Sequence, residues 1–182
     1  MSFFLSKTNL PEVLILEPQV FEDGRGFFFE SFNKKKFQAL TRLQVDFVQD
    51  NHSKSKKNTL RGLHYQIKKP QGKLVRVVKG LVYDVAVDLR RSSPNFGQWA
   101  GVELSSDNKK QLWIPEGFAH GFVVISETAE VIYKTTDYWF PEYENCLNWR
   151  DEDIGINWPT NNPNLSNKDK NGIKLKDAIV YE

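Results

Sequence analysis

Hydrophobic residues in this chain occur in short runs separated by turn-forming residues, a pattern typical of a protein built mainly from β-strands. The runs are rich in Val, Ile, Phe, Tyr and Trp, and Gly, Pro, Asn or Asp stand between them. Many short strands at this spacing predict a sandwich or barrel instead of a parallel α/β sheet. We expect strands at residues 13–16, 26–32, 47–51, 60–66, 73–78, 81–89, 99–104, 111–114, 121–125 and 130–138.

A single helix is expected to interrupt the strands, over residues 33–43. Within this segment Phe37, Leu40 and Leu43 recur at spacings of three, so they share one face of a helix. Asn33 precedes that face and has the short polar side chain that caps the N-terminus of a helix.

At 182 residues the chain has the length of one large domain, and its 40% apolar content is enough for a core. We expect a single domain across residues 1–182. The segment 81–89 is apolar on both faces, which indicates a strand covered on each side by a second sheet or by a partner subunit. From about Pro159 the composition shifts to Asn, Pro, Lys and Ser, so this C-terminal arm is predicted to be loop-rich with little core of its own.

The formal net charge of +2 is too small by itself to indicate nucleic acid as a partner. Basic residues gather at Lys54, Lys56, Lys57 and Arg61, and a solvated loop is the simpler interpretation for most of these lysines. No apolar run approaches the roughly 18 residues of a membrane span, and no N-terminal stretch resembles a signal peptide. Cys146 is the only cysteine, so we expect no intrachain disulfide, no cysteine-based zinc site and a cytoplasmic setting.

Histidine is the side chain best suited to acid–base chemistry near neutral pH, and this chain has only three. Two of them, His52 and His64, lie in the polar and basic stretch 49–66, which ends in an alternating run typical of a strand. His64 and the third histidine, His120, are therefore the first candidates for a catalytic base or acid.

Strand alternation sorts the other polar residues onto common faces. Gln49, Asn51 and Ser53 share one face, and Lys73 and Asp84 each share a face with apolar neighbours. Charged groups inside strands are costly to bury unless they are paired, so these side chains either converge on a polar pocket or lie on edge strands facing water. For Lys73 and Asp84 the sequence leaves both possibilities open.

Arg61 and His64 have opposite parity, which places them on opposite faces of an ideal strand. Gly62 lies between them and would allow a β-bulge that brings both side chains to one side. The hypothesis of a single polar pocket depends in part on such a bulge.

Residues 115–120 read Pro-Glu-Gly-Phe-Ala-His and match the P-x-G-x-x-H element of cupins, which are small jelly-roll barrels. In metal-binding cupins the other half of the site supplies His-x-His and then a glutamate. Here that half reads His64-Tyr65-Gln66, so the second histidine is a glutamine, and the glutamate is missing. Neutral glutamine is a poor ligand for a transition metal, so the pattern favours a cupin without a metal.

Five longer blocks between about Val20 and Asp169 resemble one family of cupins, the metal-independent dTDP-4-dehydrorhamnose 3,5-epimerases. Any one block would be moderate support, but all five occur in order and with family-like spacing. The blocks are FEDGRGFFFESFN (21–33), FVQDNHSKSKKNTLRGLHYQ (47–66), GKLVRVVKGLVYDVAVDLRRSSPNFGQW (72–99), QLWIPEGFAHGF (111–122) and AEVIYKTTDYW (129–139).

The resemblance implies a mainly β, cupin-type jelly-roll barrel or sandwich with a few short helices. It implies an isomerase that needs no cofactor and inverts C3 and C5 of a dTDP-linked 4-keto-6-deoxy sugar, dTDP-4-dehydro-6-deoxy-D-glucose. The product would be dTDP-4-dehydro-L-rhamnose, an intermediate of dTDP-L-rhamnose biosynthesis. The family is usually homodimeric, so the resemblance also implies a second copy of the chain as a partner.

Carried over residue by residue, the resemblance makes His64 the general base, with Asp169 as its orienting partner. Tyr133 becomes the general acid, and Lys73 lies near the C4 oxygen of the sugar. The residues that the resemblance brings against the nucleotide sugar are Arg25, Glu30, Gln49, Asp50, Asn51, Arg61, His64, Lys73, Asp84, His120, Tyr138, Glu144 and Lys168.

These residue types suit the implied reaction because C3 and C5 are both α to the C4 ketone, so removal of either proton leaves an enolate. Imidazole, with an unperturbed pKa of about 6.5, is a base matched to neutral pH. A lysine ammonium stabilises the enolate oxygen, and a tyrosine hydroxyl donates a proton from the opposite face. Arginine pairs bidentately with diphosphate oxygens, and Phe21 or Phe27 would stack on thymine.

Three alternatives remain open at this point. The first keeps the fold and substrate class but inverts one carbon only, or moves the ketone from C4 to C3. The second is a non-catalytic cupin that binds nucleotide sugars without exchanging the sugar protons with solvent. The third is a metal-dependent cupin oxygenase, which the missing ligands disfavour.

Overall fold

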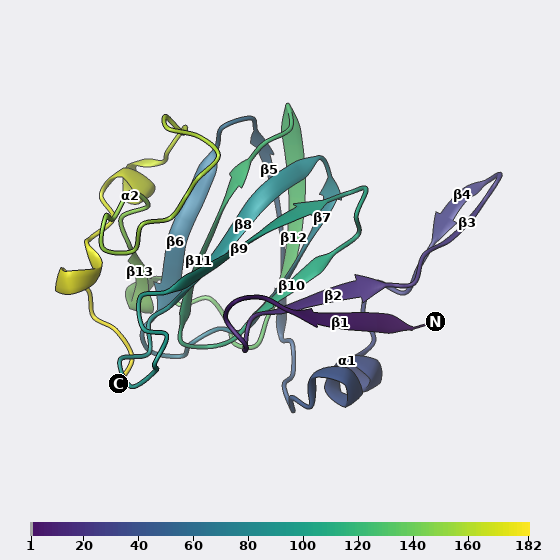
Figure 1. Cartoon of the computed structure of the whole chain (residues 1–182), viewed down its shortest axis with the longest axis horizontal. Helices are drawn as coiled ribbons and strands as arrows, with labels where there is room; N and C mark the ends of the chain where they lie inside the picture. The colour runs from purple at the N-terminus through teal and green to yellow at the C-terminus, as the bar shows by residue number, and fades with distance from the viewer. Residues whose placement is uncertain (1) are drawn as a thin grey trace.

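The computed structural model describes residues 2–182 and contains two antiparallel β-sheets that face each other (Figure 1). One sheet has six strands in the order β1-β2-β10-β7-β12-β5, and the other has five in the order β13-β6-β11-β8-β9. The sheets do not close into a continuous barrel, so the cupin-type architecture takes the form of a sandwich. The mainly β class predicted from the hydrophobic pattern is confirmed.

The six-stranded sheet contains β1 (Phe3–Lys7), β2 (Leu14–Pro18), β5 (Gln49–Lys56), β7 (Lys73–Lys79), β10 (Gln111–Ile114) and β12 (Thr128–Thr135). The five-stranded sheet contains β6 (Leu60–Gln66), β8 (Leu81–Asp88), β9 (Trp99–Ser105), β11 (Phe118–Val124) and β13 (Glu144–Cys146). A separate hairpin is formed by β3 (Phe21–Asp23) and β4 (Gly26–Phe28). The helices are α1 (Lys34–Thr41) and α2 (Asn167–Lys170), with 3-10 turns at Pro141–Tyr143 and Leu175–Asp177.

The main core fills the space between the two sheets. Val75 and Val77 of β7 pack in one cluster with Val82 and Ala86 of β8 and with Val131 of β12, and all are buried. The two residues named on β7 are two positions apart and the two on β8 are four apart, because alternate strand residues point to the same face. Burial of each such aliphatic side chain contributes roughly 1.5–3 kcal/mol relative to exposure, so this layer fixes how the strands face each other.

The outer face of the five-stranded sheet is covered by the C-terminal part of the same chain. Val85 and Val87 of β8 are fully buried in a cluster with Leu147, Ile154 and Val180. Strand β8 is therefore covered on both sides, as predicted, by the opposite sheet and by the chain's own C-terminal segment, which lies beside β6 and β13 in Figure 1. Within the arm after Pro159, Val180 and its partly buried neighbours pack against this sheet.

Helix α1 begins after Asn33, as the sequence predicts. The Asn33 side chain accepts a hydrogen bond of 3.1 Å from the Lys36 backbone N–H, and Arg42 ends the helix in the left-handed conformation with φ of 62°. The buried face of the helix carries Phe37, which packs against Phe47 and Trp113 with ring centroids 5.5 Å apart in each pair. The helix thereby covers one part of the outer face of the six-stranded sheet.

Several strand boundaries differ from the sequence-based expectation. Strand β5 continues to Lys56, so Lys54 and Lys56 lie on a strand with exposed side chains and not in a loop. Strand β11 begins three residues earlier than expected, at Phe118, and β4 ends at Phe28. Strands β1, β3 and β13 were not predicted, because their short polar or mixed sequences carry no clear alternation.

The β3–β4 hairpin extends away from the body of the molecule (Figure 1). Its aromatic side chains are largely exposed, at 45% for Phe21, 58% for Phe27 and 61% for Phe28. Among residues 2–182, no helix is both long enough and apolar enough to span a bilayer.

Candidate active site

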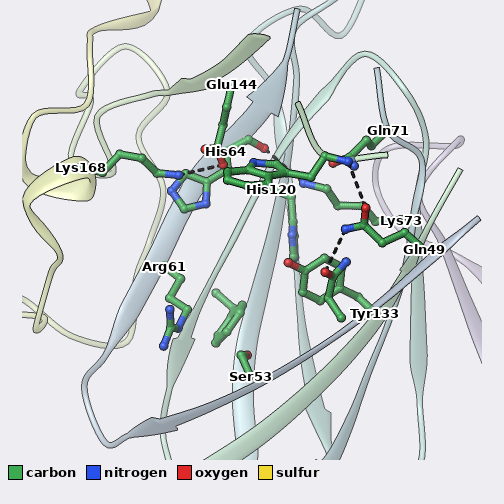
Figure 2. A pocket seen from close by; sticks show the side chains of 13 residues that line it. Gln49, Ser53, Arg61, His64, Gln71, Lys73, His120, Tyr133, Glu144 and Lys168 are labelled. Carbon is green, nitrogen blue, oxygen red and sulfur yellow. Dashed lines mark hydrogen bonds and ion pairs between the residues drawn. The ribbon is translucent and has the colours of Figure 1, made fainter. Parts of the chain in front are cut away.

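A cavity of about 320 Å³ opens between the two sheets, and polar side chains from both of them converge on it (Figure 2). Strands β5, β7 and β12 supply one wall, and β6, β11 and β13 supply the other. The residues that line it are Gln49, Asn51, Ser53, Arg61, His64, Gln71, Lys73, His120, Phe122, Tyr133, Trp139, Glu144 and Lys168.

His64 lies on β6 and pairs with a carboxylate that comes from 105 positions later in the chain. Its Nε2 is 2.7 Å from Oδ1 of Asp169, which is buried on the short helix α2. Two further groups hold this carboxylate. The Ser166 hydroxyl donates to Oδ2 at 2.6 Å, and the Gly62 backbone N–H donates to Oδ1 at 3.3 Å. Ser166 also caps α2 by accepting from the Asp169 backbone N–H.

The pair is poised for proton abstraction at neutral pH. Burial lowers the pKa of His64, and the hydrogen bond with Asp169 opposes this effect only in part, so the imidazole is neutral. Burial alone would raise the pKa of Asp169, but the hydrogen bonds from His64 and Ser166 outweigh it and lower the pKa to about 2. An ionised Asp169 accepts the Nε2–H of His64, which leaves Nδ1 as the basic nitrogen.

A second histidine–carboxylate pair stands next to the first. His120 on β11 is directly opposite His64 in the β6–β11 register. Its Nε2 lies 2.9 Å and 3.0 Å from the two carboxylate oxygens of Asp84, which is fully buried on β8. The two side chains hydrogen-bond each other inside the sheet, so the open question about Asp84 is answered: it points into the sandwich and not to water.

Lys73 and Tyr133 lie on the opposite sheet from His64. Burial lowers the pKa of Lys73 to about 8, so its ammonium is still mainly charged at neutral pH, and its Nζ donates to the backbone oxygen of His64 at 3.4 Å. Burial also raises the pKa of Tyr133, which keeps its hydroxyl protonated. The cavity therefore has a neutral imidazole on one wall, and a proton donor and a buried cation on the other.

The predicted irregularity at Gly62 is confirmed. The β6–β11 register shifts between the pairs His120–His64 and Phe122–Arg61. Gly62 has a φ of 137°, and an added Cβ would lie 2.5 Å from the Gly121 Cα, so only glycine fits this close approach. As a result, Arg61 and His64 both line the cavity despite their opposite parity.

Gln66 stands at the position of the second histidine in metal-binding cupins, and its side chain hydrogen-bonds to backbone groups. Its Nε2 donates to the carbonyl oxygens of Lys69 and Tyr138 at 2.7 Å and 3.1 Å. Its Oε1 accepts from the Phe140 backbone N–H at 2.7 Å. The amide thus fixes the loop after β12 and does not line the cavity.

Nine of the residues named from the sequence line the cavity: Gln49, Asn51, Arg61, His64, Lys73, His120, Tyr133, Glu144 and Lys168. Asp84 and Asp169 lie directly behind His120 and His64, respectively. Glu144 and Lys168 form an ion pair of 2.7 Å, which joins β13 to α2 across the cavity wall.

Four other named residues do not line this cavity. Arg25 is on the projecting hairpin with its side chain 91% exposed, where it pairs with Asp23 at 2.6 Å. Glu30 pairs with Lys36 at 2.5 Å, and Asp50 pairs with Lys134 at 3.0 Å on the outer face of its sheet. Tyr138 is 56% exposed, and its neighbour Trp139 lines the cavity in its place.

The residues carried over from the resemblance omit four that line the cavity. Strand parity had placed Ser53 on one face with Gln49 and Asn51, and all three line the cavity. Its hydroxyl is buried without a hydrogen-bond partner among the described residues. Phe122 follows His120 by two positions on β11, which is again a parity signal, whereas Gln71 and Trp139 lie outside strands and carried no such signal.

Comparison with known proteins agrees with this geometry. The family model described as dTDP-4-dehydrorhamnose 3,5-epimerase matches residues 7–177. The dTDP-4-dehydrorhamnose 3,5-epimerase of Pseudomonas aeruginosa is 58% identical over 177 residues, which cover 97% of this chain and 98% of that protein. A Legionella pneumophila epimerase solved in complex with dTDP-4-keto-L-rhamnose superposes with a TM-score of 0.94 at 49% identity, covering 96% of this chain and 94% of that one.

A more distant structure is the 3'-monoepimerase of Streptomyces bikiniensis in complex with dTDP-quinovose. It has a TM-score of 0.87 and 30% identity, and the match covers 93% of this chain and 87% of that one. The fold is thus shared by enzymes of different regiochemistry, while sequence identity is higher to the Pseudomonas aeruginosa and Legionella pneumophila 3,5-epimerases, at 58% and 49%. This chain belongs to the dTDP-4-dehydrorhamnose 3,5-epimerase family.

Proposed function

We propose that this protein inverts both C3 and C5 of dTDP-4-dehydro-6-deoxy-D-glucose and so produces dTDP-4-dehydro-L-rhamnose. The observation that carries the proposal is the His64–Asp169 pair, which faces Tyr133 and Lys73 across one cavity. Family membership supplies the substrate class, and the geometry supplies a base and an acid on opposite walls.

In the proposed mechanism, Nδ1 of His64 removes the proton from C3 or C5, and Asp169 stabilises the imidazolium that forms. The electrons pass to the C4 oxygen, where the Lys73 ammonium stabilises the enolate. The Tyr133 hydroxyl, held protonated by burial, then donates a proton to the other face of the carbon. The proton count balances, because His64 gains one proton and Tyr133 loses one in each inversion, and solvent restores both.

The cavity also contains groups suited to the nucleotide part of the substrate. Arg61 donates from its Nε to Ser55 at 2.9 Å, which leaves its terminal nitrogens free of that bond and available for phosphate oxygens. The hydroxyl of Ser53, which has no hydrogen-bond partner among residues 2–182, lies in the same cavity, and a bound phosphate or hydroxyl would satisfy it.

We further propose that Arg25 and Glu30 act on the cavity of a second copy of the chain. The hairpin that carries Arg25 projects from the body and exposes Phe27 and Phe28, which are costly to leave in water. Insertion into a partner would cover these rings and bring an aromatic ring and a guanidinium to the nucleotide. A homodimer with exchanged hairpins then accounts for residues that are outside the cavity of their own chain.

The reaction is tested by proton NMR of dTDP-4-keto-6-deoxyglucose with the protein in heavy water, with a chelator present. Loss of both the C3 and C5 proton signals is the expected result. Loss of one signal would favour the single-carbon epimerase, and no loss with retained binding would favour a non-catalytic cupin. His64→Asn should abolish exchange at both carbons while dTDP binding is retained.

The exchanged hairpin is tested by mixing two inactive variants, Arg25→Ala and His64→Asn, after reversible dissociation. Random reassociation makes half of the dimers mixed, and each of these has one intact site, so activity should return to roughly a quarter of the wild-type value. If the mixture is no more active than its parts, Arg25 does not act in a second copy.

A further inference from the structure

Cys146, the only cysteine of the chain, lies behind the His64–Asp169 pair, where the proposed reaction gives it no role. Strand β13 pairs with β6 so that Cys146 stands directly opposite His64. Its Sγ is 4.0 Å from Oδ1 of Asp169, the same oxygen that lies 2.7 Å from Nε2 of His64. One ligand atom from each of the three residues lies within 4.8 Å of the others.

Thiolate, imidazole and carboxylate are the three ligand types that zinc takes in proteins, at roughly 2.3, 2.0 and 2.1 Å, respectively. A tetrahedral ion with these bond lengths separates its ligand atoms by about 3.3–3.6 Å. The spacings of 2.7 Å and 4.0 Å at Asp169 lie on either side of that range. Small side-chain rotations that lengthen the distance from His64 Nε2 to Asp169 Oδ1 and shorten the distance from Cys146 Sγ to the same oxygen would give three tetrahedral ligands. Water would be the fourth ligand.

Occupation of this position has a defined chemical consequence. When the cation binds Nε2, the single proton of the neutral imidazole moves from Nε2 to Nδ1, and the thiol of Cys146 releases its proton to solvent. The proton then occupies Nδ1, the nitrogen that otherwise acts as the base. The bound ion would thus remove the base without blocking the wall that carries Lys73 and Tyr133.

The charges of the ligands themselves favour binding of a cation. Two of the three ligands are anionic when the ion is bound, and the nearby Lys168 is already paired with Glu144 at 2.7 Å. The His64 side chain is 24% exposed and lines the cavity, so the three residues lie next to this open space.

We propose that His64, Cys146 and Asp169 form an inhibitory site for a thiophilic divalent cation such as Zn²⁺ or Cd²⁺. Inhibition rests on the proposed epimerase function, whereas binding of the cation does not. The two are therefore measured separately on the full-length protein.

Binding is measured by titrating the protein with Cd²⁺ and recording the ultraviolet charge-transfer band of the cadmium–thiolate bond. We expect one equivalent to saturate the band in the wild type, no band in Cys146→Ala, and at least tenfold weaker binding in His64→Asn. His52→Asn removes an exposed histidine that pairs with Glu130, and should behave as the wild type. Absence of the band in the wild type would overturn the proposal. This outcome does not depend on whether the protein shows epimerase activity in the presence of chelator.

Inhibition is measured with Zn²⁺ in the proton-exchange assay. The wild type should be inhibited reversibly, with full recovery on addition of chelator, and Cys146→Ala should need at least tenfold more zinc. Equal zinc sensitivity of the wild type and Cys146→Ala would refute the role of the thiolate. If Cys146→Ala proves unstable, Cys146→Ser, which keeps the size and polarity but is a poor zinc ligand, gives the same comparison.

Discussion

Replacing Lys73 with methionine should make the protein more stable at neutral pH and much less active. Burial lowers the pKa of Lys73 from 10.5 to about 8, because the charged form is poorly solvated between the sheets. At about 1.36 kcal/mol per pKa unit, this shift corresponds to a cost of roughly 3 kcal/mol for keeping the ammonium charged in the folded state. Methionine has a similar length and no charge, so Lys73→Met removes that cost.

The depressed pKa of Lys73 also predicts how the stability difference between the wild type and Lys73→Met changes with pH. The folded-state pKa of Lys73 is depressed, so between about pH 8 and the unfolded value of 10.5 the unfolded protein binds more protons than the folded one. The stability of the wild type should therefore rise with pH across this window, and the burial cost is fully present below about pH 8. Lys73→Met should lose this rise, so the difference between the two proteins is largest at neutral pH and shrinks towards pH 10.5.

Urea unfolding at pH 7 and at pH 10 measures the free energy of unfolding of the wild type and of Lys73→Met. Lys79→Met is the matched control, because Lys79 is exposed at the other end of the same strand and should change stability little at either pH. The proton-exchange assay should show a loss of about a hundredfold in Lys73→Met, the size of effect that a lost oxyanion stabiliser has elsewhere. A Lys73→Met protein that is less stable than the wild type at both pH values would refute the reasoning.

Three further variants test the remaining parts of the site. Asp169→Asn should lower kcat by roughly 10²–10⁴-fold, because an amide fails to hold the His64 tautomer. The ionised Asp169 stabilises the folded wild type above about pH 4, and this contribution is lost as pH falls towards 2, so the free energy of unfolding of Asp169→Asn should lack this pH dependence. Tyr133→Phe should lower kcat by at least a hundredfold with little change in dTDP binding measured by calorimetry. Ser166→Ala should lower kcat by roughly tenfold through loss of its hydrogen bond to Asp169, and Ser166→Thr should restore both kcat and the pH–rate profile. Wild-type kinetics in Asp169→Asn, Tyr133→Phe or Ser166→Ala would remove that residue from its assigned role.

Strand parity made much of the cavity predictable. Gln49 and Asn51 were placed on one face by alternation alone, and β5 presents both to the cavity with Ser53. The bulge needed to bring Arg61 and His64 together was predictable from Gly62, since a residue without a side chain between two polar positions marks a close backbone approach.

Other parts of the site depend on contacts that local sequence does not encode. Asp169 reaches His64 from a four-residue helix, and its position is set by the packing of the C-terminal segment on β6 and not by its own propensity. Strand β13 has only three residues, which is too short for a periodic pattern to predict it. It nevertheless places Cys146 and Glu144 beside the cavity. The resemblance to a family located Asp169, whereas nothing in the sequence pattern linked Cys146 to His64.

The arrangement of the cavity argues that one base and one acid serve both carbons. Tyr133 is the only tyrosine among the lining residues, and the His120 side chain is just 7% exposed with its Nε2 held by Asp84. C3 and C5 flank the same C4 carbonyl, so one Lys73 ammonium stabilises the enolate formed on either side. His64→Asn and Lys73→Met should accordingly slow exchange at C3 and C5 together. Loss of exchange at one carbon alone would mean that His120 or another group provides a second base, and the single-base mechanism would then be wrong.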